Sequence, residues 1–180
     1  MKNAYGSVNS KFMGKVLKYY GFPNTIVRQI SNFILERKVI YGKEVRNWNT
    51  GLSQGLGVSN TLFILCMNYI IKDFNKKYSK KYGVKIDDNT FFVQMYADDI
   101  VIFLNKNYSS FQKVLNKLIK NFKNVGLSVN HTKCVVDNNK SNNDLYINST
   151  KINKLEDNPE FKYLGQYANE KDIWERFSEK

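Results

Sequence analysis

The sequence predicts an α+β fold in which helices pack against one largely antiparallel sheet. Three observations lead to this expectation. Apolar residues recur at helical spacing in four segments, two neighbouring apolar segments indicate strands, and shorter apolar segments follow toward the C-terminus. The expected order is helix, helix, strand, helix, strand, strand and helix, followed by short strands. A length of 180 residues with 42% hydrophobic residues fits one domain, or a large piece of one, with a core.

The first elements are two helices and an extended stretch. Apolar spacing over residues 12–20 predicts a helix that ends at Gly21-Phe22-Pro23. Asn24 is the expected cap of a second helix, whose buried stripe covers residues 26–34. Residues 38–48 then form an extended stretch or a hairpin.

A glycine-rich loop over residues 51–57 precedes the third helix, for which Ser59 is the expected cap and Phe74 the end of the buried stripe. Two apolar strands follow, over residues 91–96 and 100–104. Neither strand alternates cleanly with polar residues. We therefore expect both faces of this strand pair to be covered, as in the centre of a sheet backed by helices.

The clearest helical pattern covers residues 111–125, with an apolar stripe on one side, lysines on the other and Gly126 as the stop. Short strands are expected over residues 133–136, 145–148 and 161–164. These elements complete the α+β order.

The chain is strongly basic, with 28 Lys and Arg against 16 Asp and Glu and a net charge of +12. This charge attracts polyanions, above all nucleic acid, although a lysine-rich surface that serves only solubility explains it equally well. Only 10 Gly, 2 Pro and 2 Cys exclude collagen-like and disulfide scaffolds. The longest apolar run, residues 62–71, is too short for a membrane span. We expect a soluble intracellular protein with reduced thiols at Cys66 and Cys134.

Two adjacent carboxylates, Asp98 and Asp99, lie between the two apolar strands. An Asp-Asp pair is common in simple turns, because aspartate bonds to its own backbone and tolerates turn dihedrals. Between apolar strands, however, two neighbouring negative charges repel each other and lose hydration. A cation such as Mg²⁺, which prefers hard oxygen ligands, would resolve this conflict.

Five segments in order resemble one family. Tyr96-Ala97-Asp98-Asp99 resembles the YxDD signature of reverse transcriptases. Residues 2–8 match the tail of that family's first catalytic motif, and residues 51–55 match its glycine-glutamine-glycine loop. Residues 126–133 match its GLxxNxxK segment, and residues 161–165 match its FxYLG primer-grip hairpin. The motifs are closest to those of non-LTR retrotransposon and group II intron enzymes.

The resemblance implies a polymerase palm, a ferredoxin-like antiparallel sheet backed by helices, over residues 1–168, with a C-terminal tail over residues 169–180. It implies template-directed DNA synthesis on RNA by two-metal phosphoryl transfer, with Mg²⁺ or Mn²⁺ as cofactor. The implied partners are an RNA template, a DNA primer, dNTPs and the remainder of a retroelement polyprotein, with no membrane.

The resemblance also implies roles for single residues. Asp98 and Asp99 would hold the catalytic metals, and Lys133 would donate a proton to the pyrophosphate leaving group. Lys133 taken alone is one surface lysine among many. The implied primer and template contacts are Tyr96, Phe161, Tyr163, Leu164 and Gly165.

Three further residues would contact the nucleotide. Tyr5 matches the aromatic residue that excludes a 2′-hydroxyl, and the alternative is a core tyrosine. Gln54 would approach the nucleotide or template, with Gly55 allowing close backbone approach. The alternative for this loop is a plain turn at the start of a helix.

The sequence departs from the family pattern at important positions. The pattern places its first catalytic aspartate immediately before the residue aligned with Met1, and Gly6 replaces its second acidic residue. We therefore expect an incomplete palm without fingers, first catalytic strand or thumb, and with negligible polymerase activity of its own. The alternative function is a non-catalytic palm remnant that binds nucleic acid. A third, an RNA-dependent RNA polymerase, is disfavoured by Tyr96 and Tyr5.

Overall fold

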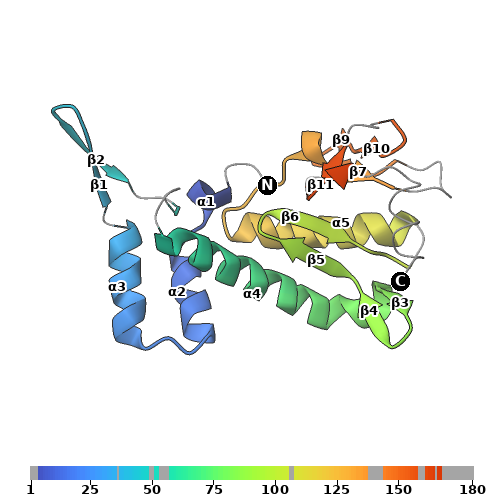
Figure 1. Ribbon diagram of the computed structural model, residues 1–180, viewed down its shortest axis with the longest axis horizontal. Coiled ribbons are helices and arrows are strands. Elements are labelled where there is room, and N and C mark those ends of the chain that lie inside the picture. Colours follow the sequence, from blue (N-terminus) through green and yellow to red (C-terminus); the bar gives the residue numbers. More distant parts are fainter. Residues whose placement is uncertain are drawn as a thin grey trace.

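Helices and short β-hairpins make up the fold (Figure 1), which confirms the α+β class. The computed structural model describes residues 4–35, 37–48, 51–52, 57–105, 108–137, 144–157, 161–164 and 166–167. The helices are α1 (Ala4–Ser7), α2 (Ser10–Tyr19), α3 (Asn24–Leu35), α4 (Gly57–Tyr82), α5 (Tyr108–Asn124) and the 3-10 helix η1 (His131–Lys133).

The strands are short and pair as neighbours along the chain, with one exception. Hairpins join β1 (Arg37–Tyr41) to β2 (Glu44–Trp48), β3 (Val84–Ile86) to β4 (Asn89–Phe91), β5 (Val93–Tyr96) to β6 (Asp99–Ile102), β8 (Tyr146–Ile147) to β9 (Thr150–Lys151) and β11 (Lys162–Tyr163) to β12 (Gln166–Tyr167). The exception is the parallel pair of β7 (Val135–Val136) and β10 (Asn153–Lys154).

The predicted helices are present, with shifted starts at two of them. The side chain of Asn9 caps α2 by accepting hydrogen bonds from the backbone N–H groups of Lys11 (2.9 Å) and Phe12 (3.4 Å). Asn24 is the first residue of α3 rather than its cap, and Ser59 lies buried inside α4, which begins at Gly57. Shifts of one or two residues are normal where a helix starts in a loop.

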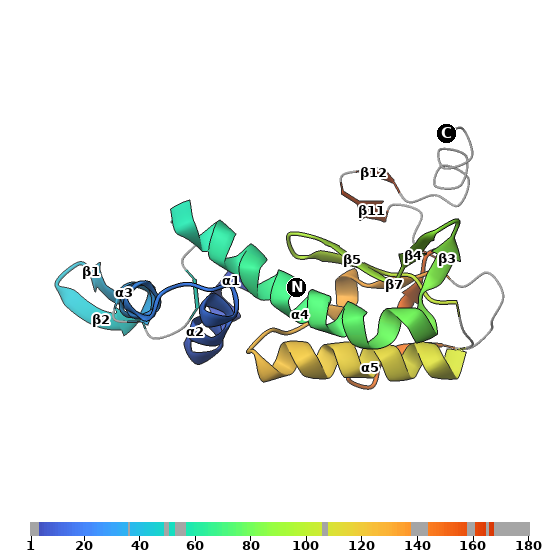
Figure 2. The ribbon, with the colours of Figure 1, turned by 90° about the horizontal axis from the view of Figure 1, so that it is seen from below.

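α4 is the central helix, and the main core forms around it (Figure 2). Its 26 residues pack against α2, β5 and α5. Burial raises the pKa of the Cys66 thiol to about 12, so this cysteine stays protonated in the core. Cys66 and Cys134 are both free thiols, as expected. Fully buried side chains of this core include Met13, Leu17, Phe63, Met67, Phe74 and Phe122.

A second, smaller core lies between α5 and the short strands that follow it. It consists of Leu115, Val136, Leu145, Ile147 and Ile152. Leu115 comes from α5, and the other four residues come from 136–152. This cluster fixes the β8–β9 hairpin against the helix.

The expectation of a single antiparallel sheet is wrong for the described strands, which form six separate two-stranded sheets. Part of the reason lies at Val93 in β5. The side-chain amide of Asn75 in α4 donates to the carbonyl of Val93 (2.9 Å) and accepts from its N–H (3.2 Å). Since a side chain from α4 takes both backbone groups, this position of the β5 edge is closed to another strand.

The expectation that both faces of β5–β6 are covered is also wrong. Val93 pairs with Ile102 and Met95 with Ile100, and these four side chains pack on the main core. The alternate positions face the other way, and Tyr96 is 69% exposed. Side chains alternate across a strand, and α4 and α5 lie on one side of this hairpin only (Figure 2).

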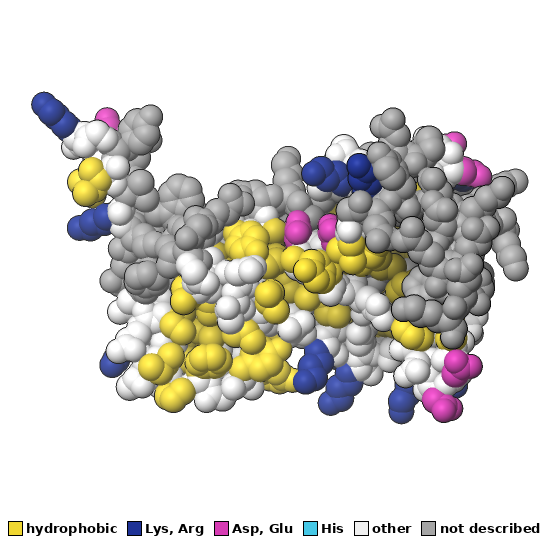
Figure 3. Space-filling model, viewed as in Figure 1, with side chains coloured by type: hydrophobic (Ala, Val, Ile, Leu, Met, Phe, Trp, Pro, Cys, Tyr) yellow, Lys and Arg dark blue, Asp and Glu magenta, His cyan; other side chains and the backbone are white. Residues whose placement is uncertain are grey.

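Aromatic side chains form a partly exposed surface where α2 meets α4. The Tyr19 ring contacts Tyr20 and Tyr69 edge to face, with centroid distances of 5.2 and 4.8 Å, and Phe12 contacts Tyr69 at 5.8 Å. Figure 3 shows hydrophobic side chains gathered over this part of the molecule. Tyr19 is 57% exposed. Contiguous apolar surface of this kind is typical of contact sites.

We expect Asn75→Ala to lower the free energy of unfolding by about 2–3 kcal/mol, because both backbone groups of the buried Val93 would lose their partner. Urea denaturation followed by circular dichroism measures this loss. Asn68→Ala is the control, since Asn68 is exposed on the same helix, and it should change stability by less than about 0.5 kcal/mol. Equal losses in both variants would contradict the bridging role of Asn75.

Candidate active site

The paired carboxylates lie at the turn of the β5–β6 hairpin. Tyr96 pairs with Asp99, so Ala97 and Asp98 form the two-residue loop. Ala97 has a φ of 52°, a left-handed conformation that costs a residue with a Cβ about 1–2 kcal/mol. Asp98 is half-buried and Asp99 is exposed. The hairpin therefore presents both carboxylates at its tip, in a turn whose backbone is strained.

The open face of this hairpin carries Tyr96 and Asp99, and it is the face directed away from α4. A third side chain approaches from β11. Burial raises the pKa of Tyr163, and the negative charge of Asp99 raises it further. The phenol of Tyr163 therefore lies within electrostatic reach of Asp99, and β11 lies on this side of the β5–β6 hairpin (Figure 2).

The β11–β12 hairpin lies on the opposite side of β5–β6 from α5 (Figure 2). Phe161 is half-buried, whereas Leu164 is 48% exposed and has a φ of 50° in the turn of the hairpin. Gly165 lies outside the described residues. The described part of this hairpin thus lies on the open side of β5–β6, and the role of its residues as primer contacts remains a prediction.

Tyr5 connects α1 to the start of α4. Its ring stacks on Phe63 with a centroid distance of 4.5 Å, and its hydroxyl donates to the Asn60 side chain at 2.7 Å. The side chain is half-buried and packs on the main core. This packing supports the core-tyrosine alternative, and it leaves the nucleotide role as a prediction.

Two glycines allow loops to approach α1 closely. Gly51 has a φ of 69°, and a Cβ there would lie 2.2 Å from the backbone of Gly6. Gly126 has a φ of 88°, and a Cβ there would lie 2.2 Å from the carbonyl oxygen of Ser7. The N–H of Leu52 also donates to the Tyr5 carbonyl at 2.7 Å. Segments 4–8, 51–52 and 126–127 therefore meet through backbone contacts that only glycine permits.

The remaining predicted residues are less informative. Lys133 is exposed at the end of η1, where its N–H donates to the Asn130 carbonyl at 3.2 Å. Its proposed proton-donor role remains a prediction. Gln54 and Gly55 lie outside the described residues.

The carboxylates fit part of a metal site. Asp98 and Asp99 offer the oxygen donors that Mg²⁺ takes from one or two carboxylates, with the rest of its shell completed by water and substrate phosphates. Within the part of the chain that the structure describes, no group of three or more His, Cys, Asp or Glu gathers around a possible metal position. The pair thus suits one side of a cation and does not form a complete cage.

A comparison with protein families identifies the family of the chain. The family model described as reverse transcriptase (RNA-dependent DNA polymerase) matches residues 1–168. The chain belongs to the reverse transcriptase family. At the family level, its activity is RNA-directed DNA synthesis, with nucleic-acid template and primer and with nucleotides as substrates. Among the described residues of this reverse transcriptase domain, no helix has the length and apolar character needed to cross a membrane.

Sequence reasoning missed the residues that support the site. Asn75 follows the apolar stripe of α4, where one amide gives no sign that it closes a strand edge 18 residues away. Asn60, in the first turn of α4, accepts the hydrogen bond from the Tyr5 hydroxyl, and no sequence pattern indicates this contact. The positive φ of Gly51 could have been suspected from the glycine-rich loop, but its contact with Gly6 could not.

We expect Gly51→Ala to lower the free energy of unfolding by at least about 2 kcal/mol, because the strained φ and the contact with Gly6 both oppose a Cβ. Two matched variants separate these causes in thermal or urea unfolding. Gly42→Ala has the positive φ in open space and should lose only about 1–2 kcal/mol, while Gly57→Ala has neither problem and should lose nothing. A Gly51 loss no larger than that of Gly42 would contradict the close packing on α1.

We expect Asp99→Asn to lower the pKa of Tyr163, because it removes the negative charge that disfavours the phenolate. In the unchanged protein the pKa of Tyr163 is raised. The neutral phenol therefore contributes to the stability of the fold at pH values below the ordinary tyrosine pKa of about 10, and this contribution is lost as the pH rises through the pKa of the folded protein. NMR titration of ring-labelled tyrosine measures the pKa of Tyr163 in the unchanged protein and in Asp99→Asn. The Tyr163→Phe variant assigns the signal of Tyr163. Asp88→Asn is the control, and an equal shift there would contradict the contact between the two segments.

Proposed function

We propose that this chain carries the palm of a retroelement reverse transcriptase of the non-LTR or group II intron type, with residues 169–180 as a tail outside the domain. The observation that carries the proposal is the pair Asp98 and Asp99 at the tip of a hairpin, with the β11–β12 hairpin on its open side (Figure 2). The family match over residues 1–168 supports it. The five motifs in family order favour the retroelement type.

In this proposal Asp98 and Asp99 hold Mg²⁺, or Mn²⁺ in its place. When bound, the metal activates the primer 3′-hydroxyl and neutralises charge on the triphosphate. Tyr96 and Tyr163 flank the carboxylates and position the primer end, together with Phe161, Leu164 and Gly165.

The nucleotide side of the proposed site comes from other segments. Tyr5 excludes a 2′-hydroxyl, Gln54 and Gly55 contact the nucleotide or template, and Lys133 supplies the proton to pyrophosphate. These roles rest on the motif positions.

We further propose that residues 1–180 alone polymerise DNA negligibly. Their carboxylates approach a cation from one side, whereas two-metal transfer needs two ions about 3.5–4 Å apart. A misplacement of even about 1 Å costs orders of magnitude in rate. A carboxylate directly before Met1, where the family pattern has one, would supply the opposite side.

The test compares three proteins: the chain itself, the chain with an N-terminal extension ending in aspartate directly before Met1, and the same extension ending in asparagine. Primer extension on an RNA template with Mg²⁺ and dNTPs is expected to give cDNA with the aspartate form only, and Asp98→Ala should abolish it. Calorimetric titration with Mn²⁺ should rank metal affinity in the same order. Template-dependent cDNA from the unextended chain, lost in Asp98→Ala, would contradict the proposed insufficiency. Equal behaviour of the aspartate and asparagine extensions would contradict the metal-site proposal.

The second candidate is a palm remnant that binds nucleic acid without catalysis. The net charge of +12 favours it, because that charge attracts polyanions whether or not a metal binds. Salt-dependent oligonucleotide binding, together with no cDNA from the aspartate extension, would favour this function over the enzyme.

A further inference from the structure

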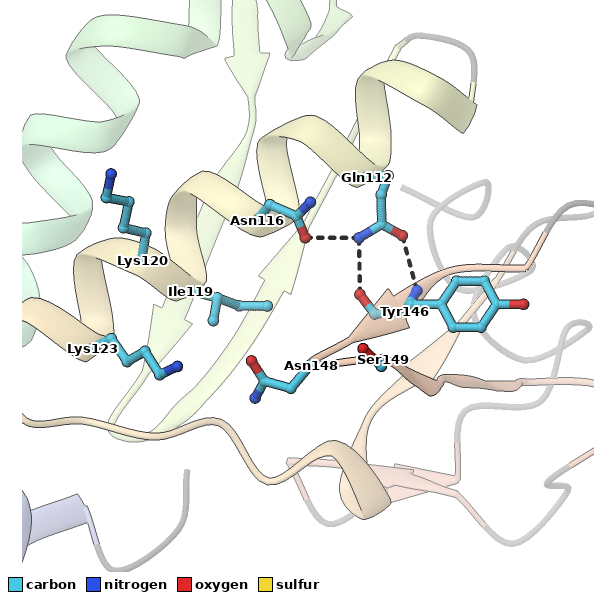
Figure 4. Close-up of a pocket in the computed structure, with 8 residues that line it drawn as sticks. All are labelled: Gln112, Asn116, Ile119, Lys120, Lys123, Tyr146, Asn148 and Ser149. Atoms are coloured by element: carbon cyan, nitrogen blue, oxygen red, sulfur yellow. Dashed lines mark hydrogen bonds between the residues drawn. The ribbon is translucent and has the colours of Figure 1, made fainter.

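A groove lies between α5 and the β8–β9 turn (Figure 4). Its floor includes Ile119. The polar side chains that line it are Gln112, Asn116, Lys120, Lys123, Asn148 and Ser149. Figure 4 shows Lys123 extending toward the turn of Asn148 and Ser149, whereas the Lys120 side chain, from the same end of the helix, extends away from that turn.

The groove is firmly built. The side chain of Gln112 donates to the Tyr146 carbonyl at 2.8 Å and accepts from the Tyr146 N–H at 2.9 Å, and it also donates to Asn116 at 2.8 Å. These bonds attach β8 to α5 in the same way that Asn75 attaches β5 to α4. The smaller core, with Leu115 and Ile147, lies beneath. The two walls are therefore held at a fixed separation.

The charged side chains among the described residues that line the groove are both lysines. Lys120 and Lys123 are exposed, and no described carboxylate forms an ion pair with either. The nearby Asp144 is paired instead with Lys151 at 2.9 Å. α5 as a whole carries four lysines and no acidic residue in 17 positions. A polyanion would thus meet cations and neutral hydrogen-bonding groups here and no opposing charge.

The shape favours a chain over a small ligand. The groove is open along α5, and amide side chains lie on both of its walls beside apolar surface. Sugar–phosphate backbones are bound in this way, by lysines together with Asn, Gln and Ser side chains. A small anion would be held instead by groups that converge around it.

We propose that this groove binds the sugar–phosphate backbone of a nucleic acid strand, at a site separate from the carboxylate turn. The site lies beside α5, and β11–β12 lies across the β5–β6 hairpin from that helix (Figure 2). A strand in the groove would therefore not occupy the face that carries Asp99 and Tyr163. The groove adds a second nucleic-acid contact that works independently of polymerisation.

Binding of a labelled single-stranded RNA to the full chain tests the proposal, measured by fluorescence anisotropy in EDTA over a series of salt concentrations. Lys120→Gln with Lys123→Gln should weaken binding about fivefold or more near 0.1 M salt, and should lower the slope of log affinity against log salt by about 1.4 for two lost phosphate contacts. The matched control is Lys85→Gln with Lys113→Gln, an equal charge loss at exposed positions outside the groove. Equal losses in both double variants would overturn the proposal.

A second pair of variants changes charge without removing a lysine. Asn148→Asp places a carboxylate in the turn at a φ of 48°, which aspartate tolerates, and should weaken binding more than Asn68→Asp on the outer face of α4. Circular dichroism checks that each variant folds. Equal effects of the two substitutions would overturn the site.

Further measurements distinguish nucleic acid from other polyanions as the ligand, and distinguish this proposal from the proposed polymerase function. Single-stranded DNA of the same sequence should show the same dependence on the groove lysines, since the contact is to the backbone. If inorganic polyphosphate binds as tightly as the RNA, and if Lys120→Gln with Lys123→Gln weakens its binding equally, the assignment to nucleic acid is overturned. Binding is measured in EDTA, where no metal-dependent polymerisation takes place, so a failure of polymerisation and a failure of the groove are distinguishable.

Discussion

The packing of loops onto the short helix α1 is the constraint on which the site depends. Gly51 approaches Gly6 and Gly126 approaches Ser7, both at distances that exclude a Cβ. These contacts join the N-terminal segment, the loop before α4 and the segment after α5, which are distant in sequence. The N–H of Asn9 adds a bond to the Val125 carbonyl at 3.1 Å. Since backbone atoms meet directly, the relative position of α4 and α5 near this point is set without adjustable side chains.

That position in turn determines which face of the β5–β6 hairpin is open. Met95 and Ile100 pack on the core beside α4, so the alternate side chains must point away from it. Asp99 belongs to this outward set. A shift of the register by one residue would send its carboxylate into the core, where an unpaired charge is costly. The same pairing that buries the apolar side chains therefore exposes the proposed metal ligand.

Local patterns predicted the helices and the β5–β6 hairpin, because their apolar spacing and turn residues act over a few positions. The absence of alternation in residues 93–102 suggested two covered faces, but Tyr96 and Val101 are apolar residues on the open face. The β3–β4 hairpin was missed because each strand has only three residues and most of their side chains are exposed, so Val84, Ile86 and Phe91 do not form a recognisable apolar run. The bridges from Asn75 and Gln112 join residues 18 and 34 positions apart, so no local pattern encodes them.

The two amide bridges explain how a domain of small sheets stays ordered. A short strand leaves backbone groups unpaired at its outer edge, and a further strand normally takes them. Here Asn75 takes those of Val93, and Gln112 takes those of Tyr146, so each strand is completed by a helix. An amide reproduces the donor and acceptor of a neighbouring strand, but it covers only one residue. The rest of the β5–β6 edge is not covered by this amide, so a further strand placed beside the hairpin would pair with more of its backbone and add stability.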